Sequence, residues 1–499
     1  MRELDGSGPA ESGRSSGPGH ARSGPGDPAS ARPPDTLGLD TCQMRELGYW
    51  VVDRVVDHFA DVADQPPVVT GTPADLRSAL GGPPPLCGGD PLVALQTLAD
   101  VALSHMQHGD HPRNFARVPG PSSFAGVLGD WLGTGFNGMA ASWVGGSGTA
   151  TVELVALDWL RSLLGLPEGT EGVMLSGGSM ANVTALAAAR ASLGPGVCYL
   201  SDQTHASIVR GLRALGFPPD HVRILPSDEE LRLPLPALAA AIQDDRGAGR
   251  HPAFVVANAG TTNTGAVDPL PQIAELCRAE GLWFHIDGAY GAPAALCDAG
   301  RRALRGIELA DSLVLDPHKW LFQPYDLGCL LVRRPGALER AFRMTPDYLA
   351  DVTGTGEEVD LRDRSLELTR RARGLKLWLT FRIHGVERIS EAIAHGIHLA
   401  EHAERLVGSD DRWRVITPAQ LGILTFALRN AGHEEHKRRA DALADEGYGH
   451  LTTTWVRDQP VLRLCIINPR TTEDDIALTL QHLGVRLDVA RAWRSTDHE

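Results

Sequence analysis

The sequence predicts an α/β fold in which a mostly parallel sheet of seven strands has helices on both faces. Short apolar runs alternate with helix-forming stretches from Thr149 to about Arg334. Each run has four to six residues and ends in a turn, which is typical of a buried strand. Ligands of such sheets bind beyond the carboxyl ends of the strands, so functional residues are expected there. The predicted strands are Gly172–Leu175, Val197–Ser201, Val222–Leu225, Ala253–Ala257, Trp283–Asp287, Ser312–Asp316 and Gly328–Arg333.

The N-terminal part of the chain differs from the rest in composition. Residues 1–36 are dense in Gly, Ser, Pro and Arg, which predicts a disordered tail without the apolar core of a secretory signal. Residues 37–122 predict a helical segment, with amphipathic helices over Leu47–Ala60 and Asp90–His105. This segment is too short to bury its own apolar faces, so we expect it to pack on another surface.

Two further domains follow. Residues 123–384 contain the seven predicted strands and form the large domain. From about Arg373 a long helix leads into residues 385–490, a smaller C-terminal α+β domain with predicted strands near Leu421–Leu428 and Val461–Ile467.

Composition limits the classes of function. The chain has 499 residues, 42% of them hydrophobic, which suits a large globular protein. Its formal net charge of −15 argues against nucleic acid or an anionic membrane as a partner. Apolar runs fall well short of the ~20 residues that a membrane span needs. The seven cysteines are an odd number without close metal-ligand pairs, so we expect reduced thiols, a cytoplasmic protein and no metal site.

Lys319 has the clearest chemical implication. It lies in the run Asp316-Pro317-His318-Lys319-Trp320, where the proline ends a predicted strand. A lysine amine becomes a nucleophile at neutral pH when it is partly desolvated or lies beside another cation, and this position offers both. For a lysine considered alone, the alternative is a stem that packs on the strand end while the ammonium reaches water.

Asp287 ends another predicted strand, in Trp283-Phe284-His285-Ile286-Asp287-Gly288-Ala289-Tyr290. Burying a carboxylate at the end of a strand costs free energy unless a cation pairs with it. The protonated ring nitrogen of pyridoxal phosphate (PLP) is such a cation, and a lysine with an aspartate is the pair that this cofactor requires. The alternative for Asp287 alone is a helix N-cap.

A phosphate site is indicated after the first predicted strand. Ser176-Gly177-Gly178-Ser179 separates that strand from Met180–Arg190, an alanine-rich stretch that predicts a helix. A glycine turn before a helix N-terminus offers free N–H groups, the positive end of the helix dipole and serine hydroxyls to an anion. Most short Gly/Ser loops are ordinary turns, so this motif gains weight from the other two.

Taken together, these motifs resemble the PLP-dependent amino acid decarboxylases of the aromatic-amino-acid and glutamate decarboxylase group. The resemblance extends from about Leu47 to about Arg470 and implies fold type I, PLP as the cofactor, an amino acid as the substrate, and a homodimer whose interface the N-terminal segment crosses. It is densest in His111-Pro112-Arg113, Ser176-Gly177-Gly178-Ser179, Asp202-Gln203-Thr204-His205, Gly260-Thr261-Thr262, His285-Ile286-Asp287-Gly288-Ala289-Tyr290 and Asp316-Pro317-His318-Lys319-Trp320.

The resemblance assigns three roles at the reacting ring. Lys319 would bind the cofactor as a Schiff base. Asp287 would pair with the ring nitrogen and keep it protonated, so that the ring accepts electrons. His205 would stack on the ring face; considered alone, it could be a hydrogen-bonded histidine at a strand end.

Other residues would hold the rest of the cofactor. The resemblance places Thr262 and Ala289 along the ring, although Thr262 alone could cap a turn. Asp316 departs from an asparagine often found in the family, and an acid near a phosphate repels it unless another group intervenes. The phosphate would be held by Gly178, Ser179, His318 and Ser312.

Tyr348 is the expected proton donor. It precedes a stretch from Ala350 to Arg364 with glycines, several acids and few apolar residues, which predicts a mobile loop. In the resembled decarboxylases a tyrosine at the start of this loop returns a proton to the substrate α-carbon, whereas relatives with phenylalanine there make aldehydes. Tyr348 therefore favours simple decarboxylation, the alternative being an exposed loop tyrosine.

The substrate side chain is harder to predict. Arg117 and Val118 stand where the aromatic decarboxylases carry a tyrosine and a phenylalanine, and Ala141 also replaces an aromatic residue. Smaller residues would widen the pocket for a larger ring such as indole. Arg117 could instead pair with a substrate carboxylate or lie on the surface. Thr369 departs from the usual glycine or serine.

Several functions therefore remain open. The favoured one is decarboxylation of an L-amino acid, preferably aromatic, to an amine and carbon dioxide. Alternatives are a decarboxylase of an acidic or other non-aromatic amino acid, a PLP-dependent aldehyde synthase or an enzyme of another PLP reaction type, and a non-catalytic paralogue. The intact lysine, aspartate and histidine argue against the last.

Overall fold

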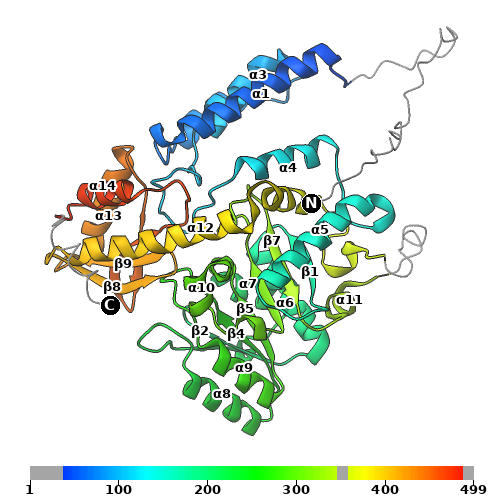
Figure 1. Cartoon of the computed structure of the whole chain (residues 1–499), viewed down its shortest axis with the longest axis vertical. Helices are drawn as coiled ribbons and strands as arrows, with labels where there is room; N and C mark the ends of the chain where they lie inside the picture. The colour runs from blue at the N-terminus through cyan, green and yellow to red at the C-terminus, as the bar shows by residue number, and fades with distance from the viewer. Residues whose placement is uncertain (1–36, 345–357, 487–499) are drawn as a thin grey trace, which may run out of the picture. The chain divides into compact units, whose positions relative to one another are not determined.

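The computed structural model describes residues 37–344 and 358–486 (Figure 1). The predicted tail at residues 1–36 lies outside these ranges, as does Tyr348. The chain divides into two compact units, the first ending at Arg54 and the second beginning at Val55. Both sheets and the predicted site residues that the structure describes belong to the second unit.

The predicted mostly parallel sheet is confirmed. Its strands lie in the order β1-β7-β6-β5-β4-β2-β3. The pairs β2–β3, β2–β4, β4–β5 and β5–β6 are parallel, and β7 is antiparallel to both its neighbours, β1 and β6. The strands are β1 Glu171–Leu175, β2 Val197–Ser201, β3 Val222–Leu225, β4 Pro252–Asn258, β5 Trp283–Asp287, β6 Ser312–Leu315 and β7 Gly328–Val332.

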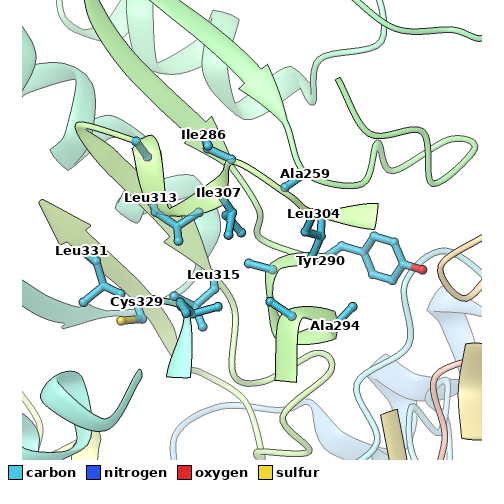
Figure 2. Close-up of a cluster of buried hydrophobic side chains, with 14 of the residues drawn as sticks. Ala259, Ile286, Tyr290, Ala294, Leu304, Ile307, Leu313, Leu315, Cys329 and Leu331 are labelled. Carbon is cyan, nitrogen blue, oxygen red and sulfur yellow. The ribbon is translucent and has the colours of Figure 1, made fainter. Parts of the chain in front are cut away.

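The central strands are buried on both faces, which explains why they are continuous apolar runs without alternation. Along β4, Val255 and Ala257 join one hydrophobic cluster, while Phe254 and Val256 join another. Figure 2 shows part of the first cluster, where Leu313 and Leu315 gather with other apolar side chains. Helices therefore cover both faces, as the sequence predicts.

The two helical layers come from different parts of the chain. Helices α6, α7 and α11 belong to one face, and α5, α8, α9 and α10 to the other. Helix α6 begins directly at the glycine turn after β1. The bounds are α4 Phe124–Gly135, α5 Trp143–Leu163, α6 Gly178–Leu193, α7 Ala206–Ala214, α8 Leu235–Gly247, α9 Leu270–Glu280, α10 Asp298–Ala303 and α11 Ala337–Phe342.

A small antiparallel sheet in the order β10-β11-β9-β8 forms the C-terminal part. In Figure 1, α12 (yellow) extends from the large sheet to this one. The sequence predicted two of its strands, corresponding to β9 and β11. It missed β8 and β10, which are partly exposed and give no apolar run. The bounds are α12 Gly374–Gly408, β8 Trp413–Gln420, β9 Ile423–Leu428, α13 His433–Asp445, β10 Thr452–Val456, β11 Gln459–Cys465 and α14 Glu473–His482.

The early helices are also found. Helix α1 (Thr41–Asp61) contains the predicted range Leu47–Ala60. Helices α2 (Pro73–Leu80) and α3 (Pro91–Thr97) follow, and α3 continues into wider turns at Leu98–Leu103. Gly385, with φ of 73°, interrupts α12 where we predict the small domain to begin. The four domain ranges stay predictions. Within residues 37–344 and 358–486, no helix is long and apolar enough to cross a membrane.

Candidate active site

One cavity of about 340 Å³ lies where the strands of the large sheet end. Eight residues predicted for the site line it, although they come from loops that are far apart in the sequence. The eight are Gly178, Ser179, His205, Thr262, Asp287, Ala289, His318 and Lys319. Ser312, at the start of β6, is not among the described lining residues, and Tyr348 lies outside the described ranges.

The predicted phosphate site is formed by the turn before α6. Gly177 has φ of 144°, and a Cβ there would lie 3.0 Å from His318 Cε1. A Cβ on Gly178 would lie 2.8 Å from Asp316 Oδ2. Both positions therefore need glycine, because a side chain would fill the space in front of the helix. The first N–H groups of α6 are left for an anion in the cavity.

Lys319 is held by Asp316. The Lys319 Nζ lies 2.8 Å from Asp316 Oδ2, in a turn that Lys319 N–H closes onto the Asp316 carbonyl. Burial lowers the pKa of Lys319, but the nearby Asp316 carboxylate, its hydrogen bond and the more distant Asp287 outweigh burial, so the pKa is raised above its usual value. In this state the amine is a charged ammonium and cannot act as a nucleophile.

His318 is held in a defined tautomer. The Leu327 N–H donates to His318 Nδ1 at 2.9 Å, so the ring proton belongs on Nε2. Burial lowers the pKa of His318 despite the attraction of Asp316, which keeps the ring neutral at pH 7. His318 Nε2 lies 3.6 Å from Asp316 Oδ2, so its N–H group is available beside the phosphate site.

Asp287 is fixed by an amide that the sequence analysis missed. Asn182 of α6 donates from Nδ2 to Asp287 Oδ2 at 3.0 Å, and the Ala289 N–H donates to Asp287 Oδ1 at 3.1 Å. The carboxylate is thus oriented without being neutralised by a side-chain cation. Asp287 caps no helix in the structure, so the N-cap alternative is wrong.

Hydrogen bonds behind Asn182 set which way its amide points. His285 Nε2 lies 3.0 Å from Asn182 Oδ1, and its Nδ1 lies 2.8 Å from Ser312 Oγ. Burial lowers the pKa of His285 to about 4, so the ring is neutral and carries one proton. The amide oxygen of Asn182 accepts that proton at Nε2, which turns the amide nitrogen toward Asp287.

The same amide also reaches His205. Asn182 Nδ2 donates to Ser207 Oγ at 3.1 Å, and Ser207 Oγ lies 2.8 Å from His205 Nδ1. The exposed ring of His205 and the buried carboxylate of Asp287 are therefore positioned by one side chain. Asn182 is four residues beyond Gly178, one turn along α6, which is the sequence signal that could have revealed it.

Ser312 has contacts that point away from the phosphate site. Its hydroxyl accepts from Trp283 Nε1 at 2.8 Å and lies 2.8 Å from His285 Nδ1. Since β6 begins at Ser312 and the cavity lies at the other end of the strand, this residue supports the network behind Asn182.

Tyr290 connects the cavity to the small sheet. Its ring stacks on Trp320 with centroids 5.2 Å apart, and its hydroxyl accepts from the Gly422 N–H at 2.7 Å. Figure 2 shows this hydroxyl directed away from the apolar cluster that holds the rest of the ring. The loop after β5 is thereby linked to the turn between β8 and β9 of the small sheet.

Arg463 of β11 fixes two loops at the cavity entrance. It is buried and donates to the carbonyl of Thr262 at 2.6 Å, to that of Asn263 at 3.0 Å, and to that of Arg117. Arg117 has φ of 55°, and its side chain is exposed. Arg117 is not among the described lining residues, so in the single chain it lies on the surface, which is one of the two alternatives given above.

The other departures from the aromatic pattern lie outside this cavity too. Ala141 is buried and its carbonyl accepts from the Arg362 N–H at 2.9 Å. Val118 packs against the main cluster, and Thr369 is exposed. The described lining residues therefore do not explain a preference for a particular substrate side chain.

The expected absence of a metal stays a prediction. In the second unit, potential ligand atoms of His58, His108 and Asp110 lie within 4.8 Å of one another. Asp110 already has two side-chain neighbours, because His58 Nε2 is 3.0 Å away and the Arg470 Nη2 atom is 3.8 Å away.

Comparison with known proteins places the chain in a family. The family model described as pyridoxal-dependent decarboxylase conserved domain matches residues 92–429. The aromatic-L-amino-acid decarboxylase of Bacillus atrophaeus is 43% identical over 455 residues, covering 89% of this chain and 95% of that protein. A phenylacetaldehyde synthase of Arabidopsis thaliana is 32% identical over 465 residues, covering 88% of this chain and 94% of that protein.

A solved structure agrees. The crystal structure of Oryza sativa TDC with PLP and tryptamine superposes with a TM-score of 0.85 at 28% identity, covering 92% of this chain and 99% of that one. The fold and the cavity define a fold type I PLP-dependent enzyme. The chain belongs to the pyridoxal-dependent decarboxylase family and is a carbon–carbon lyase that uses PLP. Lys319, Asp287 and His205 all line the cavity, which argues against the non-catalytic alternative.

The residues of the cavity fit this cofactor. An open helix N-terminus suits the phosphate, a buried carboxylate suits the protonated ring nitrogen, and a lysine suits the aldehyde. The glycines at positions 177 and 178 leave the space that the phosphate needs.

Asn182→Leu tests the network. The change keeps a buried side chain of similar size but removes the donor to Asp287 and the acceptor for His285. Leaving charged and polar groups without partners should lower the free energy of unfolding by ~1–3 kcal/mol and weaken PLP binding. Ser207→Ala, which keeps the donor to Asp287, should lower both much less. Equal effects of the two changes in urea unfolding and PLP titration would contradict this role of Asn182.

Proposed function

We propose that the enzyme converts an aromatic L-amino acid to the corresponding amine and carbon dioxide, with Lys319, Asp287 and His205 as the groups that act on the cofactor. The proposal rests on one observation: Lys319 and Asp287 line the same cavity at the N-terminus of α6. Bound PLP supplies an electron-accepting ring that stabilises negative charge on the substrate α-carbon.

Each cavity residue then has a physical task. Lys319 binds the cofactor aldehyde covalently. Asp287, oriented by Asn182, would compensate the positive charge of the protonated ring nitrogen. His205 covers one face of the ring, with its Nδ1 occupied by Ser207.

The remaining residues hold the cofactor in place. Gly178 and Ser179 offer N–H groups to the phosphate, and neutral His318 offers its Nε2–H group. Thr262 and Ala289 form walls of the ring site. The contacts of Ser312 with Trp283 and His285 favour a supporting role over phosphate binding.

The aromatic preference is supported by the relatives. An aromatic-L-amino-acid decarboxylase is the relative with 43% identity, and the superposed rice structure holds tryptamine, an indole-containing amine. An aldehyde synthase is the second candidate, because a phenylacetaldehyde synthase is 32% identical. Tyr348 distinguishes the two outcomes, since its phenol would donate a proton to the substrate α-carbon and so end the reaction at the amine.

A product assay tests the function. The PLP-loaded enzyme, supplied with tryptophan, tyrosine, phenylalanine, dihydroxyphenylalanine or glutamate, should release carbon dioxide and amine in equal amounts from an aromatic substrate. Borohydride should attach the pyridoxyl group to Lys319, and Lys319→Ala should lose both the label and nearly all turnover. Carbon dioxide from glutamate alone would contradict the aromatic assignment, and a label on another lysine would contradict the site.

Tyr348→Phe tests the proton donor. The variant should still release carbon dioxide, but the product should shift from amine toward aldehyde, ammonia and hydrogen peroxide as oxygen is consumed. Tyr325→Phe is the comparison, because this tyrosine also lines the cavity. The residue as a whole is 60% exposed, but desolvation of its phenol raises the pKa, which keeps it protonated. Diversion of the product by Tyr325→Phe, and not by Tyr348→Phe, would make Tyr325 the donor.

We also propose that the enzyme is a cytoplasmic homodimer. Phe136, Val144, Leu366 and Leu368 are apolar but exposed, and pairing of Met139 with Arg371 brings their segments together. Such a patch favours an interface between identical chains. All seven cysteines are unpaired, as expected in a reducing compartment.

Sedimentation tests the dimer. The mass should be about twice the 53.4 kDa of one chain. Phe136→Glu should shift the protein toward the monomer, whereas Leu478→Glu, at an exposed position of α14, should not. A monomeric wild-type protein would contradict the proposal.

A further inference from the structure

Asp316 presents a conflict that the proposed site does not resolve. It is 2% exposed, and its Oδ1 is a buried atom for which the structure gives no hydrogen-bond partner. Its other oxygen contacts Lys319 at 2.8 Å. Both oxygens lie near the start of α6, at 2.8 and 3.2 Å from the position that a Cβ on Gly178 would occupy. A carboxylate therefore occupies the edge of the phosphate site.

Two costs follow when the cofactor enters. The phosphate carries about two negative charges, and a carboxylate beside it is repelled in a poorly solvated cavity. The Lys319 ammonium must also lose a proton before its nitrogen can attack the aldehyde. One proton transfer removes both costs, because the acid that repels the phosphate is the nearest acceptor for the lysine proton.

We propose that Asp316 accepts the proton of Lys319 as the cofactor is attached, and that this proton neutralises the acid at the phosphate site. The inference rests on the proposed role of Lys319. In the step, the ammonium gives a proton to the Asp316 carboxylate, and the nitrogen lone pair attacks the aldehyde carbon. A carbon–nitrogen double bond forms, the aldehyde carbon–oxygen bond breaks, and the oxygen leaves as water with the two remaining nitrogen protons. The charge of the lysine–aspartate pair is zero before and after the step.

The surroundings of Asp316 support this direction of transfer. The titratable groups that face it are Lys319, neutral His318, the phenol of Tyr325 and the thiol of Cys329. Burial raises the pKa of both Tyr325 and Cys329, so these groups keep their protons at neutral pH. Lys319 is thus the neighbour with a proton to give once the phosphate approaches. Asp316 is accordingly a positioning and proton-accepting residue for cofactor loading.

The pH dependence of cofactor attachment tests the proposal. Cofactor-free protein is mixed with PLP between pH 7 and 9, where the phosphate remains a dianion, and the rate is followed by absorbance. A transfer inside the pair takes no proton from solvent, so the wild-type rate should change less than about threefold. In Asp316→Asn the amine must release its proton to solvent, so the rate should rise about tenfold per pH unit at the lower end.

A binding measurement separates the phosphate from the aldehyde. Pyridoxine 5′-phosphate has an alcohol in place of the aldehyde, so its affinity reports the phosphate and ring contacts without attachment to Lys319. Asp316→Asn should bind it about tenfold tighter or more, because the repelling carboxylate is gone. Asp202→Asn is the matched control: it removes the same charge from an exposed position after β2 and should leave both the affinity and the pH profile unchanged.

The results separate the proposed role of Asp316 from the assignment of Lys319. A wild-type rate that rises about tenfold per pH unit, with Asp316→Asn faster throughout, would overturn the proposal and make Asp316 only a counter-ion that holds the ammonium. The wild-type profile needs no variant, so a folding defect in Asp316→Asn leaves the test intact. Borohydride should label Lys319 in both proteins; a label on another lysine would overturn the assignment of Lys319 itself.

Discussion

The carboxylate of Asp287 stands at the end of β5, a strand that is buried along its whole length. Such a group is expensive to bury unless donors and a cation compensate it. Asn182 and the Ala289 N–H supply the donors, and they leave the side of the carboxylate that faces the cavity for a cationic ring. Helix α6 supplies the main side-chain donor, because Asn182 lies one turn beyond Gly178 and its amide reaches Asp287.

The rest of the site is organised around the same helix. Its first turn lies at the proposed phosphate site, Asn182 in its second turn donates to Asp287, and the network behind it extends through His285 to the start of β6. His285 can orient the Asn182 amide because burial lowers its pKa, so the ring is neutral and donates one proton to Asn182. A charged histidine would also donate from Nε2 to Asn182, but burying its charge would be costly. The buried polar chain therefore fixes the geometry of the reacting groups from inside the fold.

The sequence predicted the large sheet well, because most of its strands are short apolar runs bounded by turns. The residues that follow the strands, such as Lys319 and Asp287, could be found for the same reason. Asn182 and Ser207 were missed. The four-residue spacing of Asn182 from Gly178 was a signal for the first of them, but the contacts of both residues lie across the fold and cannot be derived from the sequence. The edge strands β8 and β10 were missed because their exposed residues interrupt the apolar pattern. For Arg117 the sequence left two alternatives, a substrate contact and a surface position. Its exposed side chain accompanies a long-range contact in which Arg463 donates to its backbone carbonyl.

The central claim is that the charge of Asp287 keeps the ring nitrogen of the bound cofactor protonated. The most direct measurement is the ¹⁵N chemical shift of ring-labelled PLP bound to the enzyme, compared with that in Asp287→Asn. The account predicts a protonated nitrogen in the wild type from pH 6 to 9, and a neutral nitrogen with a rate loss on the order of 10²-fold or more in the variant. A protonated nitrogen in both proteins, with similar rates, would contradict it.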